Sequence, residues 1–293
     1  MKINLWKGYK MKKIALTSLL AALAVSGAHA ANTIDGNPLY MPKAGHFYSV
    51  TSLESHTKNA TPWTLGEDFG YGISDKLAVE ISTSATENDN FDYMSWNDID
   101  LAVAFRALDK GAWKLDVIGA YGVDNVYPDH KPFMEKDADA LGNGGTEYTW
   151  TAGVRGGYTT SKFTVAGKAL FNYWNTESFN WNEDEGEQGV HALVLGLDAQ
   201  FVIDNNWNLV ATAEYTGLLD KEYRGNAGAK IENAGTWFGE FGVNYNIDAT
   251  KFVGAYINGT MDDWKGEAGQ PGAEKGWGFK DGFGFGVKFG IDF

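Results

Sequence analysis

The side chains that could carry out acid–base or nucleophilic chemistry are few in this chain. It has five histidines and no cysteine, which excludes disulfides, thiolate nucleophiles and thiolate metal sites. A hydrolase of the serine or aspartate type needs a base such as histidine beside its nucleophile. His130, which follows Asp129, is the best placed of the histidines, but no serine-containing motif accompanies it. We therefore expect no catalytic residue, no metal site and no cofactor.

Charge is the chemistry that the sequence offers in quantity. The chain has 38 acidic and 24 basic residues, a formal net charge of −14. This balance argues against nucleic acid as a partner, because phosphate binding needs an excess of lysine and arginine. Where the charges act depends on the elements that carry them.

The first 30 residues have the composition of a segment that is removed in the cell. Five lysines fall within the first 13 residues, an apolar run follows at 14–25, and Ala28-His29-Ala30 offers a small-x-small cleavage site. The apolar run is shorter than the roughly 20 residues that a membrane-spanning helix needs. We therefore expect residues 1–30 to be a cleaved signal peptide and residues 31–293 to form one domain. Removal of five lysines leaves 19 basic residues against 38 acidic ones.

Beyond residue 30, apolar and polar residues alternate with a period of two, which places every other side chain on one face of a β-strand. The chain is also rich in glycine, with 37 residues, and poor in proline, with six, and it shows no linker or repeat. Both features favour a single all-β domain. The clearest strand is the last, where one face carries Phe283, Phe285, Val287, Phe289, Ile291 and Phe293 and the other Gly284, Gly286, Lys288, Gly290 and Asp292.

The links between these strands alternate in length. The short ones fall at 74–76, 108–112, 159–162, 204–206 and 248–251, and the long ones at 57–62, 84–97, 124–146, 174–188, 218–234 and 259–281. This alternation predicts about 12 antiparallel strands in up-and-down order, with both termini on one side. Irregular patterns at 45–56, 62–73 and 190–203 leave 10 or 14 strands open. Glu67, which interrupts the apolar row of its strand, is expected above the lipid level or at a bulge.

Two arrangements of such strands are open: a soluble β-sandwich with its apolar faces inside, or a barrel with its apolar faces outside. Aromatic residues cluster at the strand ends, the strands run to 10 or more residues, and the polar faces mix glycine with both signs of charge. In hydrocarbon every backbone group needs an internal partner, which a closed sheet provides. We therefore expect a transmembrane antiparallel β-barrel in a bacterial outer membrane, with short periplasmic turns and long extracellular loops.

The last strand adds a family resemblance. The alternate residues Phe285, Val287, Phe289, Ile291 and Phe293, counted back from a terminal phenylalanine, resemble the closing strand of Gram-negative outer-membrane barrel proteins, which are porin-like in this respect. The resemblance implies that this row is the signal read by the barrel-assembly machinery. It covers 11 residues, and no specific family follows from it. With both termini periplasmic, this strand is expected to pair with the first strand, near residues 45–56.

In a barrel of this kind, the polar faces line the lumen. The acidic residues on them are Glu80, Asp98, Asp100, Asp116, Glu147, Asp198, Glu214, Glu240 and Asp292, and the basic ones are Arg106, Lys114, Arg155, Lys168 and Lys288. This excess of acids predicts a lumen that favours cations or neutral polar solutes over anions. Two hypotheses remain for Arg106 and Arg155. Either they pair with Asp98, Asp100 or Glu147 to set a constriction, or opposite charges simply neutralise one another in a narrow, filled barrel.

The loops leave further alternatives open. Residues 124–146 either fold inward as a constriction or form an external flap, and the role of 259–281 stays undefined. The acidic runs Glu183–Glu187 and Asp262-Asp263 could bridge divalent cations to lipopolysaccharide, but neither has the spacing of a calcium loop, and solvated loops are the simpler interpretation.

Three classes of function compete for such a barrel. A porin-like channel for passive diffusion of small polar or cationic solutes is favoured by the charged faces. A structural or adhesive barrel would act through its external loops, and an outer-membrane hydrolase would depend on His130. An autotransporter translocator is disfavoured, because few residues separate Ala31 from the first strand. The expected partners are outer-membrane lipid, lipopolysaccharide, the barrel-assembly machinery and the solute, and the oligomeric state is open.

Overall fold

The structure of the protein is a computed structural model that describes residues 37–57, 63–88, 93–124, 147–176, 188–204, 206–219, 223–224, 230–248, 250–266 and 279–293. The expected signal peptide, most of the 124–146 loop with His130, and the acidic run Glu183–Glu187 lie outside the described residues. No helix among the described residues is long and apolar enough to cross a membrane.

The described residues form 13 strands. They are β1 (Phe47–His56), β2 (Thr64–Ser74), β3 (Leu77–Asn88), β4 (Tyr93–Lys110), β5 (Trp113–Asp124), β6 (Glu147–Thr159), β7 (Phe163–Thr176), β8 (Gln188–Val202), β9 (Trp207–Leu218), β10 (Tyr223–Arg224), β11 (Lys230–Asp248), β12 (Lys251–Gly266) and β13 (Phe279–Asp292).

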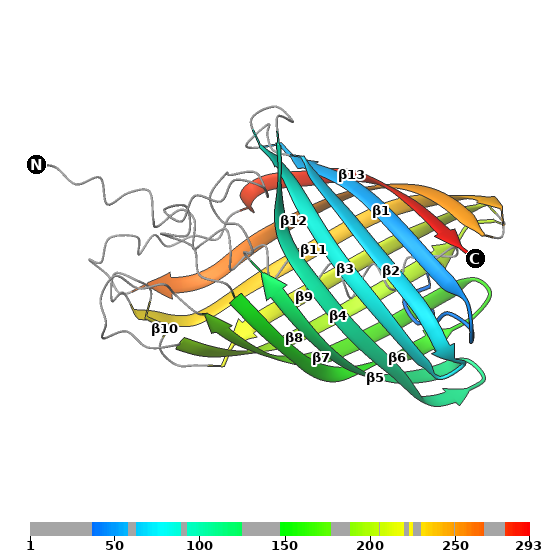
Figure 1. Ribbon diagram of the computed structural model, residues 1–293, viewed down its shortest axis with the longest axis horizontal. Helices are drawn as coiled ribbons and strands as arrows, with labels where there is room; N and C mark the ends of the chain where they lie inside the picture. The colour runs from blue at the N-terminus through cyan, green and yellow to red at the C-terminus, as the bar shows by residue number, and fades with distance from the viewer. Residues whose placement is uncertain are drawn as a thin grey trace, which may run out of the picture.

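Each strand pairs antiparallel with its neighbours in the chain, and two further contacts close the sheet. β13 pairs with β1, and β11 pairs with β9 as well as with the two-residue strand β10. The result is the expected closed barrel of 12 strands, seen side-on in Figure 1. The predicted seam is confirmed, because β1 and β13 pair without a register shift from Tyr48↔Asp292 to His56↔Gly284.

Apolar side chains face outward and polar ones inward. Leu101, Leu197 and Val287 are 48%, 60% and 55% exposed, whereas Asp116 and Asn172 are both 0% exposed. This distribution is the inverse of a soluble protein's and follows from lipid, rather than water, surrounding the sheet. The strand period of two, fixed by backbone geometry, carries the separation through the wall.

Aromatic contacts mark both ends of the apolar belt. At the end with the tight turns, Trp113 packs on Tyr158 and Trp207 on Tyr245, with ring centroids 5.1 and 4.8 Å apart. At the opposite end, Tyr121 packs on Trp150 and Tyr215 on Trp237. Aromatic girdles of this kind sit at the two membrane–water interfaces.

The tight turns lie where the sequence predicts them, at the same end of the barrel as the C-terminus (Figure 1). Gly111 takes a positive φ of 58° in the β4–β5 turn, a conformation that costs glycine nothing. In the β8–β9 turn, the amides of Asn206 and Trp207 each donate to Asp204 Oδ1 at 2.8 Å and hold the pKa of this carboxyl below its ordinary value.

Several long links are shorter than predicted. β3 and β4 extend to Asn88 and from Tyr93, into the expected 84–97 link, and β11 begins at Lys230. β12 continues to Gly266, so the pair Asp262-Asp263 lies in a strand and not in a loop. The alternation of apolar residues ends where the strands leave the lipid, but backbone pairing continues beyond it, which the sequence pattern does not reveal.

Candidate functional site in the lumen

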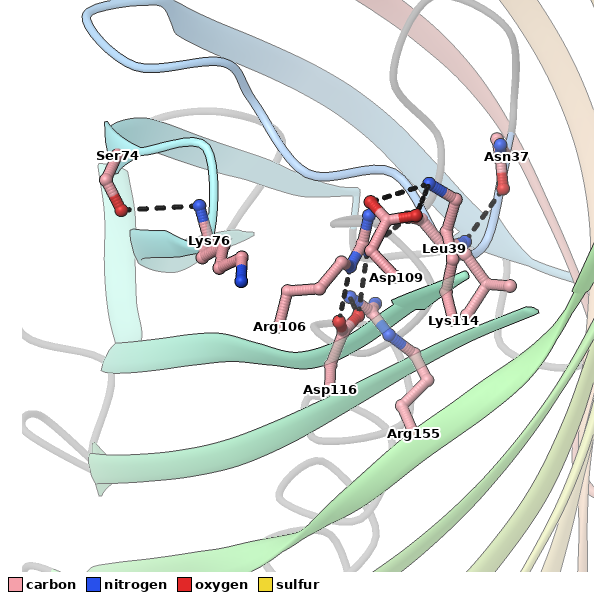
Figure 2. A network of polar contacts seen from close by, with 9 residues as sticks. All are labelled: Asn37, Leu39, Ser74, Lys76, Arg106, Asp109, Lys114, Asp116 and Arg155. Carbon is pink, nitrogen blue, oxygen red and sulfur yellow. Dashed lines mark hydrogen bonds and ion pairs between the residues drawn. The ribbon is translucent and has the colours of Figure 1, made fainter. Parts of the chain in front are cut away.

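The centre of the lumen network is a carboxylate held between two guanidinium groups. Asp116 on β5 accepts hydrogen bonds from Arg106 on β4 and from Arg155 on β6 (Figure 2). Arg106 Nε lies 2.7 Å from Oδ1, and Arg155 Nη2 lies 3.0 Å from Oδ2. The three side chains are at most 5% exposed.

The sequence-based hypothesis that these arginines pair with Asp98, Asp100 or Glu147 is therefore wrong. Asp116 is the direct cross-strand partner of both Arg106 and Arg155, and cross-strand pairs have the shortest side-chain separation in a sheet. Counting residues on either side of the short 108–112 link could have found the Arg106–Asp116 pair. Of the two original hypotheses, mutual neutralisation describes this part of the lumen.

Two further lysines are neutralised in the same way. Lys168 Nζ on β7 lies 2.6 Å from Glu214 Oε2 and 4.0 Å from Asp198 Oδ2. Lys288 Nζ on β13 lies 2.6 Å from Glu240 Oε1 and 4.2 Å from the centre of the Tyr256 ring. All four charged partners of these lysines and arginines come from the far side, β5 and β8–β11.

The opposite wall, formed by β3 and β4, is acidic. Glu80 accepts a hydrogen bond from the Tyr48 hydroxyl, and Asp98 Oδ2 accepts one from Ser84 Oγ at 2.7 Å. Asp100 Oδ1 is buried without a hydrogen-bond partner. Among the described residues, no lysine or arginine lies within ion-pair distance of Glu80, Asp98 or Asp100. This acidic wall is the unneutralised part of the lumen.

The remaining predicted lumen residues lie nearer the ends. Lys114 pairs with Asp109 across 3.3 Å beside the β4–β5 turn, and Asp292 accepts from the Tyr40 hydroxyl at 2.7 Å. Glu147 is the first residue of β6, and its side chain lies outside the described part. Sequence analysis missed several inward side chains, namely Tyr48, Asp68, Phe238, Phe252 and Tyr256.

A segment that sequence analysis did not place also occupies the lumen. We call Asn37–Lys43 the inserted segment. Its Leu39 is 1% exposed, and the Leu39 carbonyl accepts a hydrogen bond of 2.6 Å from Arg106 Nη2. Figure 2 shows Asn37 and Leu39 beside the Arg106–Asp116 pair. Tyr40 packs edge-on against Tyr48, which itself contacts Val50 and Phe252 inside the barrel.

Two glycines shape the entry of this segment. Gly45, with a φ of 82°, turns the chain back into the barrel just before β1, a conformation that other residues rarely adopt. Gly72 on β2 leaves room for it, because a Cβ there would lie 2.0 Å from the Lys43 carbonyl oxygen and 2.6 Å from that of Pro42. The inserted segment therefore has a fitted seat at the periplasmic end.

A cavity of about 80 Å³ lies between the inserted segment and the wall. Tyr40, Met41 and Pro42 line one side, and Glu80, Arg155 and Lys168 are among the wall residues. A void of roughly 10–15 Å³ holds one water molecule, so this cavity has room for several. Glu80 faces the arginine side across it, which places opposite charges on its two walls.

The histidines do not assemble a catalytic group within the described residues. His191 packs on the rings of Phe171 and Tyr173 at the lipid interface. His46 lies 3.8 Å from Asp292, and His56 lies 3.1 Å from Glu54. No group of three potential metal ligands occurs in the part of the chain that the structure describes.

Comparison with known proteins gives likeness of fold. No family model and no curated protein matches the sequence. Among solved structures, the COG4313 outer membrane channel from Pseudomonas putida F1 matches with a TM-score of 0.53 and 11% identity, over 87% of this chain and 97% of that one. The translocator domain of the autotransporter NalP from Neisseria meningitidis matches with 0.51 and 10%, over 96% and 97%. The NanC porin matches with 0.46 and 9%, over 84% and 98%.

The closed sheet, the outward apolar belt with its two girdles and these structural relatives define the class. The chain is an outer-membrane β-barrel protein. Its location is the bacterial outer membrane, as the alternation and the C-terminal strand predict.

Proposed function

We propose that this protein is a porin-like channel for the passive diffusion of small polar or cationic solutes. One observation carries the proposal: Glu80, Asp98 and Asp100 line one wall of the lumen with no lysine or arginine of the described residues paired to them. A lumen of one predominant sign, surrounded by a low-dielectric wall, concentrates counter-ions. Cations are therefore favoured over anions.

The inserted segment restricts this path at the periplasmic end. Leu39, Tyr40 and Pro42 take up space beside the Arg106–Asp116 pair and leave a cavity of about 80 Å³. A barrel of 12 strands stands between the filled barrels of about eight strands and the open ones of 16–18. We therefore expect a small conductance, with movement of the inserted segment as its main control.

The same filling favours a second candidate function, a structural or adhesive barrel that conducts nothing. An enzymatic role is not part of the proposal. It would rest on His130, and the His130→Ala variant is expected to behave as the parent toward lipid and peptide substrates. We propose lipid, lipopolysaccharide, the barrel-assembly machinery and small solutes as the partners.

The deciding experiment is single-channel recording in a planar bilayer. Folding of the sample is checked first, by the change of gel mobility on heating. Stepwise currents with a reversal potential on the cation side of zero, under a salt gradient, are expected. Silence from correctly folded protein would support the structural barrel and overturn the channel.

A further inference from the structure

Glu67 is a charged residue in the middle of the lipid-facing side of the barrel. It pairs with Thr51 of β1 on one side and Thr83 of β3 on the other, in unbroken register. The irregularity of β2 lies elsewhere, between Gly72 and Ser74. Both sequence-based expectations, a position above the lipid or a bulge, are therefore wrong.

Two aromatic residues locate Glu67 in the membrane. Trp63 and Tyr71 share its outward row, four residues away on either side, and they pack on Phe285 and Phe47 respectively. A strand rises about 3.3 Å per residue and tilts by roughly 40°, so each aromatic lies on the order of 10 Å above or below Glu67. The carboxyl group thus sits near the centre of an apolar belt about 25 Å tall.

Hydroxyl groups surround this carboxyl group on the outer surface. Ser49 Oγ donates to Glu67 Oε1 at 2.5 Å, and Thr51 Oγ1 donates to Oε2 at 2.6 Å. We call Ser49, Thr51, Glu67 and Thr83 the outer polar patch. It spans three adjacent strands, β1 to β3.

No other part of the described wall resembles the outer polar patch. The middle of the outward row holds apolar or small residues in β4–β9 and β11–β13, for example Leu101, Val117, Leu195, Phe241 and Val287, which are 42–55% or similarly exposed where lipid would cover them: 48%, 47%, 48%, 50% and 55%. Polar groups in contact with hydrocarbon are costly and, where they occur, usually face protein. The outer polar patch is therefore a surface that calls for a protein neighbour.

We propose that the outer face of β1–β3 is the contact between two copies of this chain, related by a two-fold axis. Such a contact uses the same surface twice and must be self-complementary. The outer polar patch meets this condition, because it holds hydroxyl donors beside a carboxyl group with about four acceptor sites, of which its own chain uses two. Its serine and threonine side chains are small and allow the walls to approach closely. The inference does not depend on channel activity.

Cysteine crosslinking tests this proposal directly, because the chain has no cysteine of its own. Leu65→Cys places a thiol next to Glu67 on the outward row of β2, and Leu197→Cys places one on β8; the parent leucines are 43% and 60% exposed. Folded variants in liposomes are treated with a short bismaleimide. Leu65→Cys should give several-fold more dimer than Leu197→Cys. Equal yields, or a single chain by mass photometry in nanodiscs, would overturn the proposal in favour of lipid as the occupant.

A second substitution asks whether the outer polar patch itself holds the copies together. In the Leu65→Cys background, Glu67→Leu should lower the dimer yield several-fold, whereas Glu67→Gln, which keeps an acceptor and adds a donor, should largely retain it. Heat-modifiable gel mobility confirms that both variants fold. A dimer yield that Glu67→Leu leaves unchanged would contradict the proposed contact.

Discussion

Arg106 binds Asp116 through two parallel hydrogen bonds, Nε to Oδ1 at 2.7 Å and Nη2 to Oδ2 at 3.1 Å, and the same Nη2 donates to the Leu39 carbonyl at 2.6 Å. One guanidinium group therefore joins the wall of the barrel to the inserted segment. This two-way contact links the charge balance of the lumen to the blockage of its periplasmic end.

Removal of the Asp116 charge should destabilise the barrel. Asp116→Asn leaves Arg106 and Arg155 buried without a negative partner, and breaking a buried pair in this way costs about 3–5 kcal/mol. Urea unfolding in detergent or lipid measures the loss. The control is Asp109→Asn, which breaks the more exposed pair with Lys114 and should cost less than about 1 kcal/mol. Equal effects of the two substitutions would show that the buried network contributes little.

A side chain at Gly72 should expel the inserted segment. In Gly72→Ala, the new Cβ would lie 2.0 Å from the Lys43 carbonyl oxygen, a contact that only movement of the backbone relieves. The single-channel conductance should rise above that of the parent. Gly119→Ala is the matched control, because its Cβ meets no atom closer than 3.9 Å. An unchanged conductance in Gly72→Ala would mean that the inserted segment does not limit the current.

A disulfide should hold the inserted segment in place. Asn37 Nδ2 lies 3.3 Å from Thr159 Oγ1, so Asn37→Cys with Thr159→Cys places two thiols within reach of each other. The oxidised double variant should conduct less than the same protein after reduction, while each single variant should ignore the reductant. Identical currents before and after reduction would argue against motion of this segment.

Neutralisation of the acidic wall should reduce cation preference. Asp98 and Asp100 are 6% and 4% exposed and lie on the lumen side of β4. In Asp98→Asn combined with Asp100→Asn, the reversal potential under a salt gradient should move toward zero, because fewer fixed charges attract counter-ions. Asp204→Asn, in the exposed β8–β9 turn, is the control and should leave the potential unchanged. A potential unaffected by the double substitution would contradict the proposed selectivity.

Loss of the terminal phenylalanine should impair insertion. Phe293 stacks on Phe47 with ring centroids 5.8 Å apart, and the two residues exchange backbone hydrogen bonds of 2.7 and 2.9 Å at the seam. Phe293→Ala should lower the amount of folded protein in outer-membrane fractions several-fold. Phe241→Ala, at a lipid-facing phenylalanine of β11 that is 50% exposed, should have a weaker effect. Equal losses would mean that the terminal position carries no special signal.

The sequence by itself determined the class of fold and the compartment. The period of two is a property of the extended backbone, so the outward row from Phe283 to Phe293 and the inward positions of Asp98, Asp100 and Asp116 could be assigned without knowing any neighbour. The short links ordered the strands, and the pairing of the last strand with the first followed from the positions of the termini.

Only the tertiary structure decided which groups meet. Asp116 binds both arginines because register, set by bulges such as the one between Arg106 and Leu108, brings three strands level, and register is not written in alternation alone. The inserted segment has no periodic pattern, and its place depends on the space above Gly72 and on a free donor of Arg106. Glu67 looked like a break in a strand, but its neighbours in the closed sheet show it to be a polar centre on the lipid-facing wall.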